Sequence, residues 1–423
     1  MRKPILIVSV VASAALLATS PLFAQLQTPL GPLGLPGIGR GVRDVLETAG
    51  DGLNGASAVA QREANRLLRL RDRQLERLLR QHRDLVERDA NGNLARRGEL
   101  LVTGPTSGEL AALQRAGFSV IAEERVEGLD LAIVRLQVPA GLSLARAEAS
   151  ARKAAPEAEI AVDNLHWQSG APAAQGGAMP MPALLAAPNG ASIDTPIGII
   201  DGAPGPSLRT MGSKGFAKGA LLASDHGSAI VSLLQAEGAG RLWVADVYGS
   251  DPAGGNALAI VRALGWLATS GCKVVTISLV GPRNTVLERA IAQAQQRGMV
   301  IVAAVGNDGP AAPPAFPASY AKVVSVTGVD RKGRALIEAG RALHLDYAAP
   351  GADVHAVNAK GKAVSLRGTS FATPLVAVRL ADALARGSDW RARLDREARD
   401  LGPRGPDDRY GRGLLCERCG SKR

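Results

Sequence analysis

Four short polar segments in the second half of the chain contain side chains that could act together in hydrolysis. Asp201 directly follows the apolar run Ile197-Gly-Ile-Ile, and His226 opens an apolar stretch of helical character. Asn307 lies in a glycine-rich turn after a run of small apolar residues, and Ser370 stands at the start of another predicted helix. An acid, an imidazole, an amide and a hydroxyl are the groups that serine hydrolases combine.

The chemistry gives each of these residues a role. A serine hydroxyl is a weak nucleophile unless an imidazole removes its proton during attack. We therefore expect Ser370 to attack a carbonyl carbon, with His226 as general base and then general acid and Asp201 orienting the imidazole. The oxyanion that forms needs donors held ready, and the Asn307 side chain and the Ser370 backbone N–H at a helix start can supply them.

Each of these residues taken alone has an ordinary structural explanation. Asp201 or Ser370 could cap a helix, His226 could be a packed core histidine, and Asn307 could form a turn. Their occurrence together, in this order, favours catalysis. The chain has no G-x-S-x-G or H-E-x-x-H signature of rival hydrolases. A catalytically silent peptide-binding protein is the second hypothesis, and loss of a triad member would favour it.

The four segments resemble the motifs of the subtilase family of serine endopeptidases, in the same order. Residues 368–374 match G-T-S-x-A-x-P, the segment at His226 matches H-G-S, and residues 304–309 match A-x-G-N-x-G. The resemblance covers residues 193–415, including a closing Y-G-x-G turn at 410–413. The chain departs from the family after Asp201: Gly202 and Ala203 stand where the family has Thr or Ser and then Gly. A hydroxyl expected to help orient the acid is therefore missing.

The resemblance also implies where a peptide substrate binds. Ser278, Leu279 and Val280 match the edge strand on which subtilases pair the substrate backbone, and residues 247–250 match the opposite side of the cleft. The resemblance extends the substrate-binding set to Ala304 and Gly306. Pairing an extended peptide along a strand edge gives affinity with only loose sequence preference. An ordinary strand and turn remain the alternative for these segments.

The elements around these residues predict an α/β fold. Apolar strands are expected at 196–200, 242–247, 274–279, 300–304 and 323–327, and helices at 225–235, 256–268, 285–297 and 370–385. Nearly continuous apolar strands alternating with helices indicate a mostly parallel sheet covered on both faces. The resemblance makes this a three-layer subtilisin-like domain, and function in such sheets gathers at the carboxyl ends of the strands.

Residues 98–168 predict a separate small α+β domain. Strands at 99–103, 118–124, 129–138 and 158–162, with helices at 107–116 and 143–154, give the order βαββαβ of a ferredoxin-like sandwich. This domain is similar in size and order to the subtilase propeptide, an intramolecular folding aid and inhibitor. We expect residues around His166 to Gly170 to lie in the active site like a product. We also expect self-processing between this domain and the protease domain, which are joined by the exposed, charge-poor linker 169–192.

The N-terminal region predicts export. Arg2 and Lys3 precede a short apolar run, and a cut after Ala24 would remove residues 1–24 as a signal peptide, leaving a secreted protein, extracellular or periplasmic. The run is too short to serve comfortably as a transmembrane anchor, and no later apolar stretch of about 20 residues follows. Residues 25–97 predict a linker and a basic amphipathic helix at 57–88. Packing of this helix against the precursor is favoured over membrane or nucleic-acid binding, and an adaptor role is a third hypothesis.

The composition of the chain limits the classes of partner and cofactor that we expect. The chain is 46% hydrophobic and 21% charged, with a net charge of +11. Its basic residues are spread out, without zinc-finger spacing or an aromatic-interleaved patch, so we expect polypeptide substrates and the chain's own propeptide as partners rather than nucleic acid. We expect no cofactor and identify no metal ligands; structural calcium, common in related enzymes, stays open. Cys272 is expected to be buried, and Cys416 and Cys419 in the tail 416–423 to form a disulfide or remain thiols. His82, His166, His344 and His355 are interpreted as incidental.

Overall fold

The computed structural model describes residues 27–28, 31–32, 53–168, 171–172 and 192–420. The expected signal peptide at 1–24 and most of the two expected linkers lie outside these residues. Residues 27–28 (β1, Gln27–Thr28) and 31–32 (β2, Gly31–Pro32) form a short antiparallel pair. Among the described residues, no helix combines the length and apolar character needed to cross a membrane.

A seven-stranded parallel sheet forms the centre of the larger domain. Apart from the partly exposed edge strand at 212–215, its strands are buried along almost their whole length, as expected of a sheet covered on both faces. Because all the strands run parallel, their carboxyl ends meet at one edge. In spatial order the strands are β11 (Gly212–Gly215), β12 (Leu242–Asp246), β10 (Ile197–Asp201), β13 (Val274–Ile277), β15 (Val300–Ala304), β16 (Val324–Val329) and β17 (Tyr347–Pro350).

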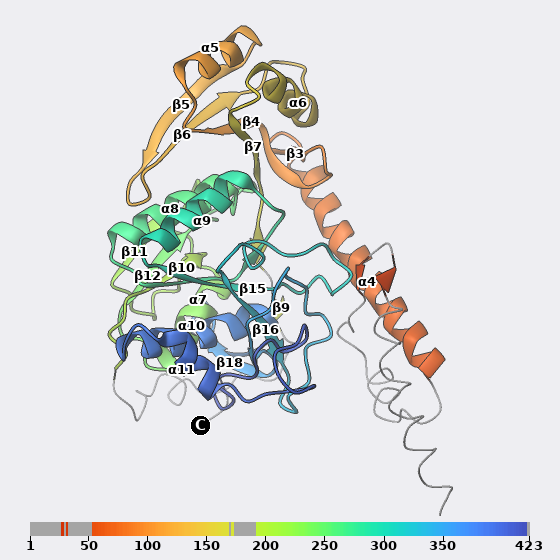
Figure 1. The fold of residues 1–423 in the computed structure, drawn as a ribbon, viewed down its shortest axis with the longest axis vertical. Coiled ribbons are helices and arrows are strands. Elements are labelled where there is room, and N and C mark those ends of the chain that lie inside the picture. The colour runs from red at the N-terminus through yellow and green to blue at the C-terminus, as the bar shows by residue number, and fades with distance from the viewer. Residues whose placement is uncertain (1–26, 29–30, 33–52, 169–170, 173–191, 421–423) are drawn as a thin grey trace, which may run out of the picture.

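Helices cover both faces of this sheet and give three layers (Figure 1). On one face lie α8 (Ala257–Thr269) and α9 (Thr285–Gln296); on the other lie α7 (Asp225–Ala236) and α10 (Thr369–Ala385), with α11 (Trp390–Glu397) beside α10. Each helix layer packs its own buried apolar cluster against the sheet. The expected three-layer α/β fold with a mostly parallel sheet is confirmed.

A smaller α+β domain precedes it in the chain. Its antiparallel sheet has the order β3-β4-β6-β5, with β7 also paired to β4. Neighbouring residues of a strand face opposite sides of a sheet. Leu100 and Val102 accordingly pack in the cluster beneath the small domain's own helices, whereas Leu101 packs in the cluster that contains α8 and α9. The elements are β3 (Val86–Arg88), β4 (Leu94–Thr103), α5 (Ser107–Arg115), β5 (Ser119–Val126), β6 (Leu131–Gln137), α6 (Leu144–Ala154) and β7 (Glu159–Asn164).

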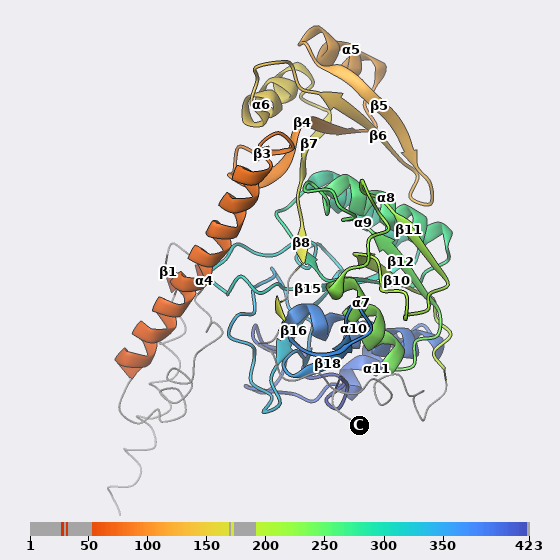
Figure 2. The ribbon, with the colours of Figure 1, turned by 180° about the vertical axis from the view of Figure 1, so that it is seen from behind.

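The small domain lies directly on helices α8 and α9, and its last strand leads down into the larger domain (Figures 1 and 2). The order β4-α5-β5-β6-α6-β7 is the expected βαββαβ. Both faces of its sheet are thereby buried, one under its own helices and one against the larger domain.

The long helix α4 (Leu53–Gln81) differs from its expected position at 57–88. The chain turns after Gln81, and Val86–Arg88 instead pairs with the start of β4. Val86 is fully buried with Leu75 and Leu94, so tertiary packing overrides the helical pattern that Leu85 and Val86 continue. The small domain's sheet therefore begins before residue 98, the boundary expected from the sequence.

Candidate active site

Asp201 and His226 meet at the carboxyl edge of the parallel sheet. Asp201 is the last residue of β10 and its side chain is 0% exposed. His226 lies in the first turn of α7, whose N-cap Ser224 accepts a hydrogen bond from the Gly227 backbone N–H at 2.9 Å. The capped helix start holds the imidazole over the strand end, and His226 Nδ1 lies 2.8 Å from Asp201 Oδ2.

Ser370 lies beside this pair at the start of α10. The His226 ring and the ring of Phe371, the next residue after the serine, are 5.3 Å apart between centroids. Ser370 Oγ donates to the Ser278 carbonyl at 3.3 Å, and Ser278 Oγ donates to the Ser370 carbonyl at 2.9 Å. His226 Nε2 has no hydrogen-bond partner in the described part of the chain. The structure therefore brings the three predicted residues together with the Asp–His contact formed and the His–Ser contact open.

The amide of Asn307 is held at the same helix start. Its Oδ1 accepts from the Thr369 backbone N–H at 3.0 Å, and Thr369 Oγ1 donates to the Gly306 carbonyl at 3.1 Å. With the oxygen committed, Nδ2 is the donor left over, and it is buried without a partner among the described residues. An unsatisfied buried donor needs an explanation, and a ligand oxygen beside Ser370 would satisfy it.

The predicted substrate strand is occupied by the chain itself. β14 (Leu279–Val280) pairs antiparallel with β8 (Trp167–Gln168), with Leu279 opposite Gln168 and Val280 opposite Trp167. Farther along, β9 (Ala171–Pro172) pairs antiparallel with β19 (Ala363–Arg367), the partner of β18 (Val354–Val357). The chain is thus held on β14 before residue 169 and on β19, three residues ahead of Ser370, after residue 170. The predicted residues Ala304, at the end of β15, and Gly306 are buried below this segment, and a Cβ on Gly306 would lie 3.1 Å from a methyl of Val280.

His166, interpreted from the sequence as incidental, is buried in the cleft. Its backbone N–H donates to the Gly255 carbonyl at 2.8 Å, and its carbonyl accepts from the Tyr248 hydroxyl at 3.0 Å. The ring packs on Gly281, where an added Cβ would lie 2.5 Å from it. Burial lowers the pKa of His166 to about 4, so the imidazole is neutral. The position of His166 follows from the path of the chain beyond β7, in line with the expectation that residues from about His166 onward lie near the active site.

Gln168 is a second residue that the motifs did not reveal. Its Nε2 donates to Asp201 Oδ1 at 2.9 Å, and the Gly202 backbone N–H donates to the same oxygen at 2.8 Å. The hydroxyl that was expected to be missing after Asp201 is therefore replaced, in this structure, by a carboxamide from residue 168.

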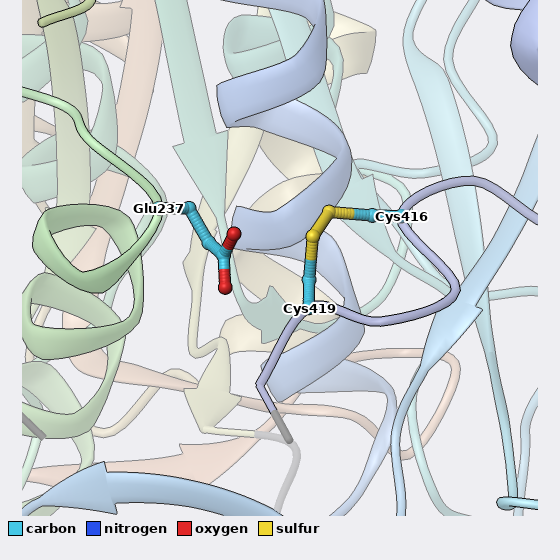
Figure 3. Close-up of side chains that lie close together, drawn as sticks. All are labelled: Glu237, Cys416 and Cys419. Atoms are coloured by element: carbon cyan, nitrogen blue, oxygen red, sulfur yellow. A yellow bond between two sulfur atoms is a disulfide. The ribbon is translucent and has the colours of Figure 1, made fainter. Parts of the chain in front are cut away.

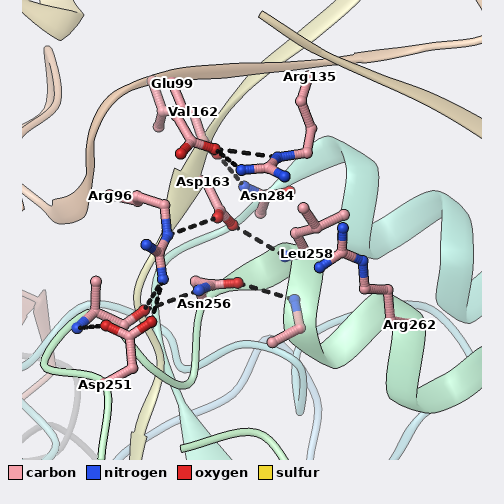
Figure 4. A network of polar contacts seen from close by, with 12 residues as sticks. Arg96, Glu99, Arg135, Val162, Asp163, Asp251, Asn256, Leu258, Arg262 and Asn284 are labelled. Atoms are coloured by element: carbon pink, nitrogen blue, oxygen red, sulfur yellow. Dashed lines mark hydrogen bonds and ion pairs between the residues drawn. The ribbon is translucent and has the colours of Figure 1, made fainter. Parts of the chain in front are cut away.

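A polar network joins the small domain to helices α8 and α9 (Figure 4). Asp163, at the end of β7, accepts from the Leu258 backbone N–H at 2.9 Å, and Arg96 lies 3.8 Å from its other oxygen and bonds Asp251 at 2.6 Å. At the start of α9, Asn284 Nδ2 donates to the Val162 carbonyl at 2.8 Å. Burial raises the pKa of Asp163 to about 6, against the opposing effects of the Leu258 hydrogen bond and Arg96.

Helix α4 contacts the loop that carries Asn307. Arg71 Nε lies 3.2 Å from Asp308 Oδ2, and the Arg71 guanidinium stacks 5.7 Å from the Trp167 ring centroid. A Cβ on Gly309 would lie 2.8 Å from Leu67 Cδ1, so glycine permits the close approach of the helix. The basic helix therefore packs on the larger domain, next to β8.

The C-terminal cysteines lie away from this cleft. Cys416 and Cys419 form a disulfide, and Glu237 at the end of α7 lies beside them (Figure 3). The ligand atoms of the three residues lie within 4.8 Å of one another. Because the sulfurs are bonded to each other, they offer no thiolate for a metal ion. Cys272 is a buried free thiol, and burial raises its pKa to about 12.

Comparison with known proteins places the site in a family. A model of the subtilase family matches residues 215–413. Subtilisin DY of Bacillus licheniformis is 32% identical over 244 residues, which cover 52% of this chain and 88% of that protein. Subtilisin Savinase of Lederbergia lenta is 30% identical over 229 residues, covering 50% and 83%.

A solved structure shows the same fold. Fervidolysin from Fervidobacterium pennivorans, described as a keratinolytic enzyme related to subtilisin, superposes with a TM-score of 0.62 at 16% identity. The match covers 77% of this chain and 61% of that chain. The sequence resemblance is thus supported by both sequence relatives and architecture.

Proposed function

Because the chain belongs to the subtilase family of serine-type endopeptidases, we propose that it is a secreted enzyme made as a precursor, with Asp201, His226 and Ser370 as its catalytic triad. The observation that carries the proposal is the pairing of the chain on both flanks of residues 169–170. Trp167–Gln168 pairs with β14 and Ala171–Pro172 pairs with β19, as an extended substrate would.

The proposed reaction uses the groups already described. Ser370 Oγ attacks the peptide carbonyl while His226 takes its proton through Nε2 and later delivers it to the leaving amine. Asp201 holds the imidazole through Nδ1 and stabilises its cation. The open His226–Ser370 contact fits a resting site, since catalytic hydrogen bonds often tighten only in the reacting complex.

The oxyanion is stabilised by Asn307 Nδ2 and the Ser370 backbone N–H at the start of α10. The Nδ2 donor is unsatisfied until a substrate oxygen arrives, so its hydrogen bond is gained as charge develops. The substrate backbone pairs with Leu279 and Val280, as β8 does here. All of these groups belong to the chain itself.

We further propose that the precursor cuts itself between Ser169 and Gly170. Three peptide bonds separate Gln168, the last residue of β8, from Ala171, the first residue of β9. The bond between Ser169 and Gly170 is the middle one. The fragment ending at Ser169, with the small domain and α4, then acts as an inhibitor until it leaves. The predicted signal peptide at 1–24 would direct export beforehand.

The test compares wild-type precursor with Ser370→Ala in a protease-deficient host. We expect wild type to yield a new N-terminus at Gly170 and to hydrolyse casein, whereas Ser370→Ala keeps residues 169 and 170 joined and leaves casein intact. N-terminal sequencing and intact mass measure self-cleavage. Casein hydrolysis is measured alongside labelling of Ser370 by a fluorophosphonate probe. Trimming of Ser370→Ala at the same bond would assign processing to another enzyme. Intact casein with folded, propeptide-free protein would refute the protease itself.

A further inference from the structure

We infer that this protease prefers substrates with glutamine at the second residue on the amino side of the cleaved bond, because that side chain completes the surroundings of Asp201. In the precursor, Gln168 holds this position. The inference rests on the proposed function and names the class of substrate that the site selects. Gln168 in the precursor, and the glutamine at the same position of a substrate, are positioning groups that act through Asp201.

The first argument is the hydrogen bonding of Asp201. The carboxylate is fully buried, so each of its oxygens needs donors from the protein or from a ligand. Oδ2 is bonded to His226 Nδ1; Oδ1 accepts from the Gly202 N–H and from Gln168 Nε2. Without the carboxamide, Oδ1 would keep one donor, and the carboxylate that orients His226 would be held less firmly.

The second argument is that residue 202 cannot supply the missing donor. A Cβ on Gly202 would lie 2.6 Å from Ser224 Cβ and 2.7 Å from Ser224 Oγ, which excludes any side chain there. Ser224 in turn is committed as the N-cap of the helix that carries His226. Gln168 Nε2 lies 3.6 Å from the same Cβ position. The carboxamide thus sits beside the place where a side chain of residue 202 would begin.

The third argument is register. Gln168 lies opposite Leu279, and main-chain pairing with β14 is independent of side-chain identity. Any peptide that pairs in this register places its own side chain at the same point, because side-chain direction is fixed by the pleat. Glutamine has both the reach and an uncharged donor. Asparagine is one methylene shorter, methionine has similar length without a donor, and glutamate brings a second negative charge toward Asp201.

The experiment uses mature wild-type enzyme and the peptide Leu-His-Trp-Gln-Ser-Gly-Ala-Pro, which repeats residues 165–172, with Gln, Asn, Met or Glu at its fourth position. We expect kcat about tenfold lower with Met or Asn than with Gln, and lower still with Glu, while KM changes by less than about threefold. Equal kcat for Gln and Met, or a difference confined to KM, would overturn the inference while leaving the protease intact. Failure to cleave any of the peptides or casein would refute the proposed function and the inference with it.

Two protein variants provide independent arms. Precursor Gln168→Met should cleave itself about tenfold more slowly than wild type, whereas the matched control Gln114→Met, exposed on α5, should cleave at the wild-type rate.

The double variant Gly202→Ser/Ser224→Gly makes room for a hydroxyl at residue 202 and keeps an accepted N-cap residue. For the double variant, with its concentration set by active-site titration, the ratio of kcat for the Gln peptide to kcat for the Met peptide should fall toward one. An unchanged ratio, or equal self-cleavage of Gln168→Met and wild type, would contradict the positioning role.

Discussion

At the scale of single residues, Asn307 joins catalysis to local structure. Its oxygen is bonded to the Thr369 backbone N–H, which is one of the unsatisfied donors at the start of α10. The same bond turns the amide so that Nδ2 is the donor left for a substrate oxygen. One side chain therefore both fixes the loop after β15 to the nucleophile's helix and supplies the proposed oxyanion contact.

Replacing Asn307 with alanine should lower kcat by about 10²–10³ and leave KM nearly unchanged, the loss known for the oxyanion asparagine of subtilisin. The reason is that Nδ2 gains its partner only as the oxyanion forms. Steady-state kinetics on a peptide substrate measure the effect, with Asn307→Asp as a companion that keeps the Thr369 contact and lacks the donor. A rise in KM alone would show that Asn307 only shapes the cleft.

Residue-level prediction from sequence was possible where the signal is local. Asp201, His226, Asn307 and Ser370 each lie within a short contiguous pattern, because strand ends and helix starts constrain their immediate neighbours. Gln168 could not be found this way. The sequence shows that residue 202 lacks a side chain, but the contact of Gln168 with Asp201 also depends on the course of β8 along β14, which is a property of the folded chain.

At the scale of elements, α4 shows a similar limit. Its apolar periodicity continues through Leu85 and Val86, so the sequence gives no reason to end the helix at Gln81. The end is decided by pairing of Val86–Arg88 with β4, a long-range contact. The main strands and helices of the larger domain were predictable because their apolar runs are long and buried, whereas the short β8, β9, β18 and β19 have no such pattern.

The position of α4 gives an element-level prediction. Arg71→Ala should weaken retention of the cleaved N-terminal fragment by about tenfold, because Asp308 would lose its cationic partner in a largely buried setting. The matched control is Arg73→Ala, which removes the same charge from an exposed arginine whose side chain bonds the Arg69 carbonyl on the helix itself. Dilution of the self-cleaved complex, with recovery of casein hydrolysis as the readout, measures retention. Equal weakening by both substitutions would indicate a general charge effect instead of the Arg71–Asp308 contact.

At the scale of the whole molecule, the small domain is tied to the protease through two helix starts. Asp163 bonds the first turn of α8, and Val162 and Asn164 bond Asn284, the N-cap of α9. The same β7 continues into β8 and the active site, so docking on the helices sets the position of residues 166–168 in the cleft. Docking and the proposed inhibition therefore involve one continuous segment of the chain.

Asp163 makes this docking depend on pH. Its pKa is about 6 in the complex, raised from the usual 3.8 by burial, and it is expected to return to the ordinary value when the fragment leaves. A carboxyl whose pKa is higher in the complex than in the separated parts stabilises the complex fully when the pH is below its pKa in the separated state. This contribution is lost as the pH rises through its pKa in the complex. Between about pH 4 and 6 the Asp163 contribution alone should make the fragment dissociate more readily as pH increases, by up to about tenfold per pKa unit. His166, whose pKa burial lowers to about 4, contributes in the opposite direction, because its protonation on release favours dissociation as pH falls. The charged groups acting on Asp163 are Arg96, Glu99 and Arg135, with Asp251 on the far side of Arg96.

The matched variant is Asp163→Asn, which keeps an acceptor for the Leu258 N–H and carries no charge at any pH. We expect it to hold the fragment more tightly than wild type at pH 7. Between pH 4 and 6 only the His166 contribution remains, so the variant should bind the fragment more tightly as pH rises. The measurement is the dissociation constant of the cleaved complex, made with phosphonylated Ser370 so that the fragment is not degraded. An Asp163→Asn profile parallel to wild type would show that Arg96 compensates the buried charge and that another group governs release.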